Sequence, residues 1–89
     1  MQVTAELSLY PLVDNYEGVI IAFIKNLKLS SEVVVLTHAM STYVKGENVD
    51  VFKAVSQALE MSNRQVETLS LVIKVVSRDL PVENGFLNF

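Results

Sequence analysis

Residues 2–10 alternate strictly between apolar and polar side chains, and this pattern constrains the fold more than any other part of the chain. A period of two predicts a β-strand with one side buried and the other open. Pro11 should end this strand because proline has no N–H to donate to a neighbouring strand. The pattern returns over residues 66–77, where we expect a second strand of the same kind. The rows expected to be buried are Val3, Ala5, Leu7 and Leu9 in the first strand and Leu69, Leu71, Ile73 and Val75 in the last.

Two stretches of helical periodicity lie between these strands. Apolar residues from Val19 to Leu27 recur at helical spacing, which predicts a helix over about residues 15–29. Asp14 and Glu17 precede it in the spacing of a capping box. Asn48 is suited to cap a second helix over about residues 49–63, which carries one apolar face.

A β-hairpin is expected between the two helices. Residues 33–38 are rich in β-branched side chains, which favour strands. A short connection at Ala39 and Met40 leads to a second strand over residues 41–45, which we expect Gly46 to end. The order of the elements predicts an α+β fold of the ferredoxin-like βαββαβ type. Its four-stranded antiparallel sheet would carry both helices on one face.

The chain divides into a domain over residues 1–77 and a C-terminal tail over residues 78–89. Pro81 and Gly85 make a continuous helix or strand in the tail unfavourable. Its apolar side chains are too numerous for a solvated segment: they are Leu80, Val82, Phe86, Leu87 and Phe89. We therefore expect the tail to pack on the domain or on a neighbouring subunit.

Composition argues against several classes of protein. The 89 residues are 51% hydrophobic, which excludes a disordered chain. The absence of cysteine excludes a disulfide framework and a cysteine-ligated metal. The net charge of −3 and the scattered basic residues argue against nucleic-acid binding. No apolar run approaches the ~18–20 residues of a membrane span. The first ten residues include Glu6 and no basic region, so we expect no signal peptide and a cytoplasmic location.

The side of the sheet away from the helices is expected to mix polar and apolar side chains. Tyr10, Val72 and Val76 belong to it, although a fully solvated face would not favour them. A chain this small buries a limited share of its surface, so some apolar area has no place within one copy. We expect a homodimer or homotetramer that assembles through sheet faces.

Two segments resemble a known family. Residues 6–12, Glu-Leu-Ser-Leu-Tyr-Pro-Leu, and residues 37–42, Thr-His-Ala-Met-Ser-Thr, are similar to the thiamine-binding YkoF-like family. Val-Lys-Gly-Glu at residues 44–47 extends the similarity, which covers about residues 2–77. The resemblance implies a small ferredoxin-like domain that binds thiamine or its hydroxymethylpyrimidine moiety, in vitamin salvage, transport or buffering.

The resemblance also implies a ligand pocket on and beside the open face. Its candidate residues are Glu6, Ser8, Tyr10, Thr37, His38, Met40, Ser41 and Thr42. The Glu6 carboxylate suits the ring nitrogen and amino group of an aminopyrimidine, and Tyr10 suits stacking on a flat heteroaromatic ring. From the residues alone, two alternatives stay open. Glu6 could pair with Lys74 on the neighbouring strand, and Tyr10 could pack beneath a partner's sheet.

His38 is the only histidine, and no carboxylates cluster with it at metal-ligand spacing. It could act as a general base, but the sequence offers no identifiable nucleophile. A hydrogen-bonded histidine in a turn is the alternative. We therefore expect a binding protein without enzymatic activity or cofactor. The alternative function is a structural or regulatory oligomerisation module without a dedicated ligand.

Overall fold

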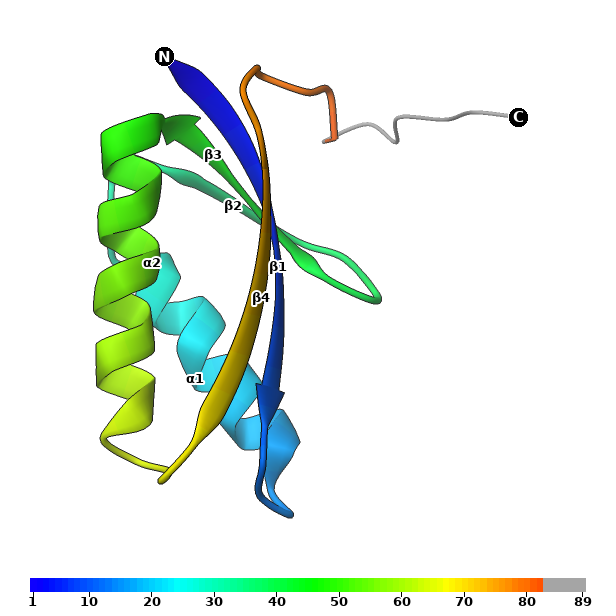
Figure 1. Cartoon of the computed structure of the whole chain (residues 1–89), viewed down its shortest axis with the longest axis vertical. Coiled ribbons are helices and arrows are strands. Elements are labelled where there is room, and N and C mark those ends of the chain that lie inside the picture. Colours follow the sequence, from blue (N-terminus) through cyan, green and yellow to red (C-terminus); the bar gives the residue numbers. More distant parts are fainter. Residues whose placement is uncertain (83–89) are drawn as a thin grey trace.

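The computed structural model describes residues 1–82 and confirms the ferredoxin-like α+β fold. Every strand pair is antiparallel, and the order across the sheet is β2-β3-β1-β4. Both helices lie on one side of the sheet (Figure 1), whereas the β2–β3 turn and the segment after β4 project on the other. The elements are β1 (Gln2–Pro11), α1 (Tyr16–Leu27), β2 (Val34–Thr37), β3 (Thr42–Glu47), α2 (Asn48–Asn63) and β4 (Leu69–Val76).

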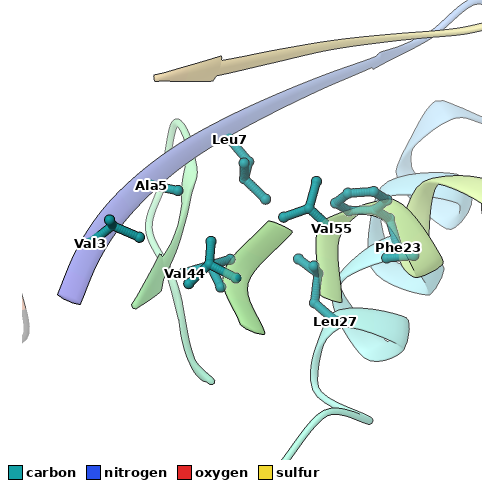
Figure 2. Close-up of a cluster of buried hydrophobic side chains, with 9 residues drawn as sticks. Val3, Ala5, Leu7, Phe23, Leu27, Val44 and Val55 are labelled. Carbon is teal, nitrogen blue, oxygen red and sulfur yellow. The ribbon is translucent and has the colours of Figure 1, made fainter. Parts of the chain in front are cut away.

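The core lies between the sheet and the helices, and the apolar row of β1 forms its floor. Val3, Ala5 and Leu7 are buried there, as the alternation predicts. Figure 2 shows helix side chains meeting this row. Each fully buried valine, leucine or phenylalanine side chain stabilises the fold by roughly 1.5–3 kcal/mol. The other members of the buried cluster are Phe23, Leu27, Val44, Val51, Val55 and Ala58.

The helix starts differ from those expected. Asn15 occupies the N-cap position of α1 without a side-chain hydrogen bond, so the capping box predicted at Asp14 and Glu17 is wrong. Glu17 still lies in the first turn, where a negative charge is favourable. Asn48 is the first residue of the second helix and the extended Glu47 holds the N-cap position, so the prediction that Asn48 caps this helix is wrong.

The prediction that Gly46 ends the third strand is also wrong, because β3 continues to Glu47. Gly46 pairs with Val3 and has a φ of 155°, a conformation that favours glycine. A Cβ atom at this position would lie 3.1 Å from the carbonyl oxygen of Glu32. The glycine therefore permits a close approach of the chain that precedes β2.

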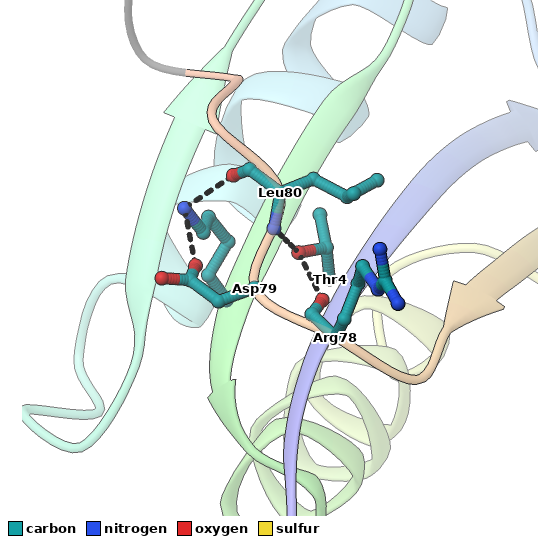
Figure 3. A network of polar contacts seen from close by, with 5 residues as sticks. Thr4, Arg78, Asp79 and Leu80 are labelled. Atoms are coloured by element: carbon teal, nitrogen blue, oxygen red, sulfur yellow. Dashed lines mark hydrogen bonds and ion pairs between the residues drawn. The ribbon is translucent and has the colours of Figure 1, made fainter.

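Residues 78–82, which we call the strap, run across the face of the sheet that lacks helices. Thr4 Oγ1 donates to the carbonyl of Arg78 and accepts from the N–H of Leu80, both at 2.9 Å (Figure 3). One hydroxyl of β1 thus satisfies two backbone groups of the strap.

Lys45 of β3 fixes the strap at a second point. Its Nζ donates to the carbonyl oxygen of Leu80 at 2.6 Å and forms an ion pair with Asp79. The residue is only 7% exposed although it lies on the side away from the helices. The part of the tail expectation that concerns residues 83–89 lies outside the described residues.

Candidate functional site

Glu6 lies near the middle of β1, and its side chain projects from the face opposite the helices. Tyr43 of β3 and Lys74 of β4 are its Cα partners on the two neighbouring strands. Directly paired residues on one face have Cβ atoms about 4.5–5.5 Å apart. The register therefore places the three side chains in one row across the sheet.

Both oxygens of the Glu6 carboxylate have partners. Oε2 accepts from the Tyr43 hydroxyl at 3.0 Å and from the Ser41 hydroxyl at 3.2 Å. Oε1 lies 3.4 Å from Nζ of Lys74. The pairing with Lys74, one of the alternatives left open by the sequence, is therefore present together with two hydroxyl donors.

These contacts set the charge of the site. The hydrogen bond from Tyr43 is the main cause that lowers the pKa of Glu6 below its ordinary value. Partial burial acts against it, while Ser41 and Lys74 add smaller lowering effects. Glu6 is therefore a carboxylate at neutral pH. Its Oε1 contacts a lysine whose side chain is 72% exposed, so this partner can give way to a ligand.

The turn between β2 and β3 separates two hollows. One, of about 450 Å³, is lined by Glu6, Tyr43, Val82 and turn residues 38–41. A further space of about 170 Å³ extends towards Leu80 and shares Glu6, Tyr43 and Val82 with it. We call these two neighbouring spaces together the Glu6 hollow. Its floor is the sheet, and the strap forms part of its wall.

The second hollow, of about 190 Å³, lies between α1 and the end of β1, and we call it the α1 hollow. Ile20, Phe23 and Ile24 form its apolar wall. β3 begins at Thr42, opposite Leu7, so residues 8–11 of β1 extend past it. The space beside residues 8–10 of β1, where β3 is absent, forms part of the α1 hollow.

The residues predicted for the site divide between these two hollows. Glu6 lines the Glu6 hollow, whereas Ser8, Tyr10, Thr37 and Thr42 line the α1 hollow. The turn residues His38, Met40 and Ser41 border both. Thr42 is buried and shares the helix-facing side of β3 with Val44. The structure thus joins Glu6 to Ser41 but does not bring Ser8 or Tyr10 to the carboxylate.

His38 supports the tyrosine that holds Glu6. Its ring meets the Tyr43 ring edge to face, with centroids 4.9 Å apart and an angle of 89° between the planes. Its backbone N–H donates to the carbonyl of Ser41 at 2.9 Å and closes the turn. Met40 at the tip of the turn is exposed and flexible enough to cover a ligand.

Sequence reasoning missed Tyr43, Leu80 and Val82 as parts of the site. A signal for Tyr43 exists, because Ser41, Tyr43 and Lys45 alternate on one side of their strand. The sequence of the strap carries no such signal, since no local pattern predicts where an irregular segment crosses a sheet.

Within residues 1–82, no group of three or more His, Cys, Asp or Glu side chains is placed to hold a metal ion. In the same part of the chain, no helix is both long and apolar enough to span a membrane.

The fold occurs in several solved structures. Protein SP2199 from Streptococcus pneumoniae is 20% identical, with a TM-score of 0.82 over 94% of each chain. A domain of unknown function from Bacillus cereus, DUF77, is 25% identical, with a TM-score of 0.75 over 88% of this chain and 77% of that one. A candidate thiamine biosynthesis/salvage protein from Thermotoga maritima is 16% identical, with a TM-score of 0.79 over 88% of this chain and 85% of that one.

A comparison with curated proteins finds no match. A family model, however, covers most of the chain: the model of the YKOF-related family matches residues 2–79. The match includes all six elements of the fold and the Glu6 row, and it confirms the family resemblance of residues 6–12 and 37–42. The chain therefore belongs to the YKOF-related family.

Proposed function

We propose that this chain is a binding protein for thiamine or its hydroxymethylpyrimidine moiety and has no catalytic activity of its own. The ionised Glu6 carboxylate carries the proposal, because its Oε1 faces a hollow and contacts only a displaceable lysine among the described residues. Membership of the YKOF-related family supports it. The name of the Thermotoga maritima structure, a candidate thiamine biosynthesis/salvage protein, supports it as well.

Recognition would use the two carboxylate oxygens differently. Tyr43 and Ser41 hold Oε2, which fixes the plane of the carboxylate before a ligand arrives. The amino group of a pyrimidine then donates to Oε1 and displaces Lys74. Hydrogen bonds to a charged acceptor are among the stronger ones in proteins, and an acceptor that is already oriented loses little entropy on binding.

The walls of the Glu6 hollow suit a flat ring. Val82 and Met40 offer apolar surface, and His38 and Tyr43 offer aromatic surface. Small-molecule sites commonly combine such walls with a few polar groups that fix orientation.

Capture rather than turnover follows from the state of Glu6. A general acid or base works best with a pKa near the operating pH. The hydrogen bond from Tyr43 instead lowers the pKa of Glu6, which keeps the carboxylate ionised as an acceptor and makes it a poorer proton shuttle at neutral pH.

Calorimetric titration with thiamine and with hydroxymethylpyrimidine tests this proposal. We expect saturable binding of at least one ligand by the native chain and a loss of about tenfold or more with Glu6→Gln, since a charged hydrogen bond contributes roughly 1.5–3 kcal/mol. Glu67→Gln is the matched control, because Glu67 is exposed and lies outside both hollows. Ser8→Ala reports on the α1 hollow and should leave affinity unchanged.

Absence of binding up to millimolar ligand would refute the proposal. Equal losses with Glu6→Gln and Glu67→Gln would refute the role of the carboxylate.

A second candidate function, assembly through the open face, is favoured by exposed apolar residues there. Tyr10 and Val72 are more than half exposed, although both lie on strands in the sheet. The strap already covers Thr4 and Lys45, so a partner would contact the other end of this face. In that case the native chain would form dimers or tetramers in light scattering and bind neither ligand.

A further inference from the structure

The strap supplies one wall of the Glu6 hollow, chiefly through Val82. This side chain lines both of the spaces that meet at Glu6 and Tyr43. It is only 8% exposed, although the strap is neither helix nor strand. Leu80 lines the smaller space as well. The shape of the hollow therefore depends on where the strap holds Val82.

A tight turn in the strap directs Val82 towards the hollow. The N–H of Val82 donates to the carbonyl of Leu80 at 2.9 Å, so the chain turns about Pro81. A hydrogen bond between residues two apart defines a γ-turn, whose common form has a central φ near −75°. Proline holds φ at about −65°. Pro81 therefore favours this turn even before the strap docks on the sheet.

The groups that anchor the strap lie in the row of side chains next to Glu6. Thr4 of β1 is the Cα partner of Lys45 of β3, just as Glu6 is the partner of Tyr43. Thr4 and Glu6 are two residues apart on the same strand, so the two rows lie about 7 Å apart on one face of the sheet. A strap that leaves the first row therefore removes a wall from the second.

Leu80 links the anchors to Val82. Its N–H donates to Thr4 Oγ1 at 2.9 Å, and its carbonyl accepts from Lys45 Nζ at 2.6 Å (Figure 3). The same carbonyl accepts the N–H of Val82 that closes the turn. The backbone of one residue thus connects the two anchors on the sheet to the side chain that lines the hollow.

The strap can leave the sheet without disturbing the strands. The hydrogen bonds from Leu80 reach side chains of β1 and β3, and the pairing of these two strands continues beneath the strap. Docking also removes the ammonium group of Lys45 from water, a cost that its partners must offset. Release of the strap would restore that hydration. The docked and released states are therefore closer in free energy than the hydrogen bonds alone suggest.

We propose that the strap is a lid on the Glu6 hollow, and that Thr4 and Lys45 are positioning residues that hold this lid closed. A flat heteroaromatic ring bound to Glu6 contacts Val82 only when the strap is docked. Ligand binding and strap docking therefore favour each other, and the coupling is reciprocal. This inference rests on the proposed function, because the ring bound at Glu6 is the ligand that closes the lid.

The lining of the smaller space explains why such a ring would favour the docked strap. Val76 of β4 lines this space together with Leu80 and Val82. A ring that enters it takes the place of water beside these apolar side chains, which is favourable. In the released state two of the three side chains would be missing from the wall. The gain from this contact therefore goes to the docked state alone.

Hydrogen exchange at the amide of Leu80 in the native chain reports directly on the lid. This N–H is bonded to Thr4 in the docked strap, so its exchange requires the strap to open. Saturation with hydroxymethylpyrimidine or with thiamine should slow the exchange about fivefold or more. The amide of Ser30 is the control, because it donates to Leu27 after α1 and lies outside the hollow. Its exchange rate should not change.

Charge reversal at Lys45 tests the coupling from the other side. Lys45, unlike Thr4, does not line the hollow, and Lys45→Glu places a carboxylate against Asp79 and the carbonyl of Leu80. We expect the strap to be released and the affinity for hydroxymethylpyrimidine to fall about fivefold or more in calorimetric titration. An added carboxylate does not repel a neutral pyrimidine, so the loss reports on the strap. Lys53→Glu, on exposed surface of α2, makes the same change of charge and should leave the affinity unchanged.

The outcomes separate the lid from the proposed function. Unchanged exchange at Leu80 in a native chain that binds its ligand would overturn the lid and leave the proposed function intact. Equal affinities of Lys45→Glu and Lys53→Glu would do the same. Absence of binding by the native chain would instead refute the proposed function, and the lid with it.

Discussion

The hydroxyl of Tyr43 donates to the carboxylate of Glu6 at 3.0 Å from the position directly opposite it on the neighbouring strand. Two paired strands, rather than a loop, therefore fix the acceptor of the candidate site. The edge-to-face contact of His38 with the same ring steadies the donor. Glu6 is thus held in place before any ligand arrives, as preorganised binding requires.

Removal of the Tyr43 hydroxyl should change the acidity of Glu6. This hydrogen bond is the largest cause that lowers the pKa of Glu6, so Tyr43→Phe should raise that pKa towards or above its ordinary value. An NMR titration of the Glu6 carboxyl carbon in both proteins measures the shift. Tyr16→Phe, on exposed surface in α1, serves as the control. An unchanged titration midpoint in Tyr43→Phe would refute the contact.

Stability should decline in acid through the same carboxylate. The pKa of Glu6 is lower in the folded than in the unfolded chain, so its contacts stabilise the fold above the unfolded value of about 4.5. This contribution is lost as the pH falls through the lower, folded pKa. Glu47, paired with the N-terminal ammonium, acts in the same direction. In urea unfolding at a series of pH values, Glu6→Gln should show a shallower acid decline than the native chain, whereas parallel curves would argue against the account.

Substitution by alanine should affect stability differently at Gly46 and at Gly18. Gly46→Ala adds a Cβ atom near the carbonyl of Glu32 at a φ of 155°, so we expect a loss of roughly 1–3 kcal/mol in the free energy of unfolding. Gly18→Ala in α1 meets only the end of the exposed Asn15 side chain and gains helix propensity. It should be neutral or slightly stabilising. Equal changes in the free energy of unfolding for the two variants, measured in urea, would mean that the backbone conformation at residue 46 does not require glycine.

The sequence predicted the fold well because the evidence for it is local. The alternation of Val3, Ala5 and Leu7 identifies a half-buried strand without knowledge of its neighbours. Glu6 was predicted as a site residue but its partner Tyr43 was not, because their pairing depends on the register between β1 and β3. Turn geometry and packing set that register, and neither can be read from one strand alone.

The burial of Lys45 could not be predicted at all. Lysine is almost never fully buried unless it is paired. Its partners in the strap, Asp79 and the carbonyl of Leu80, are more than 30 residues away along the chain. Thr4 likewise looked like a solvated position of an open face, and the strap covers it.

Release of the strap should destabilise the chain. Thr4→Val keeps the shape of the side chain but leaves the N–H of Leu80 and the carbonyl of Arg78 without their partner, at an expected loss of about 1–3 kcal/mol. Thr68→Val, at an exposed position, should change stability by about 0.5 kcal/mol or less. Urea unfolding compares the two. A Thr4→Val variant as stable as Thr68→Val would show that the strap adds little to the fold.

The position of a bound pyrimidine tests the central claim most directly. A crystal structure of the chain with hydroxymethylpyrimidine would show which hollow the ring occupies. We predict that the ring lies in the Glu6 hollow, with its amino group within hydrogen-bond distance of Glu6 Oε1 and Lys74 displaced. A ring in the α1 hollow against Ile20 and Phe23, with the contacts of Glu6 unchanged, would contradict this account of the site.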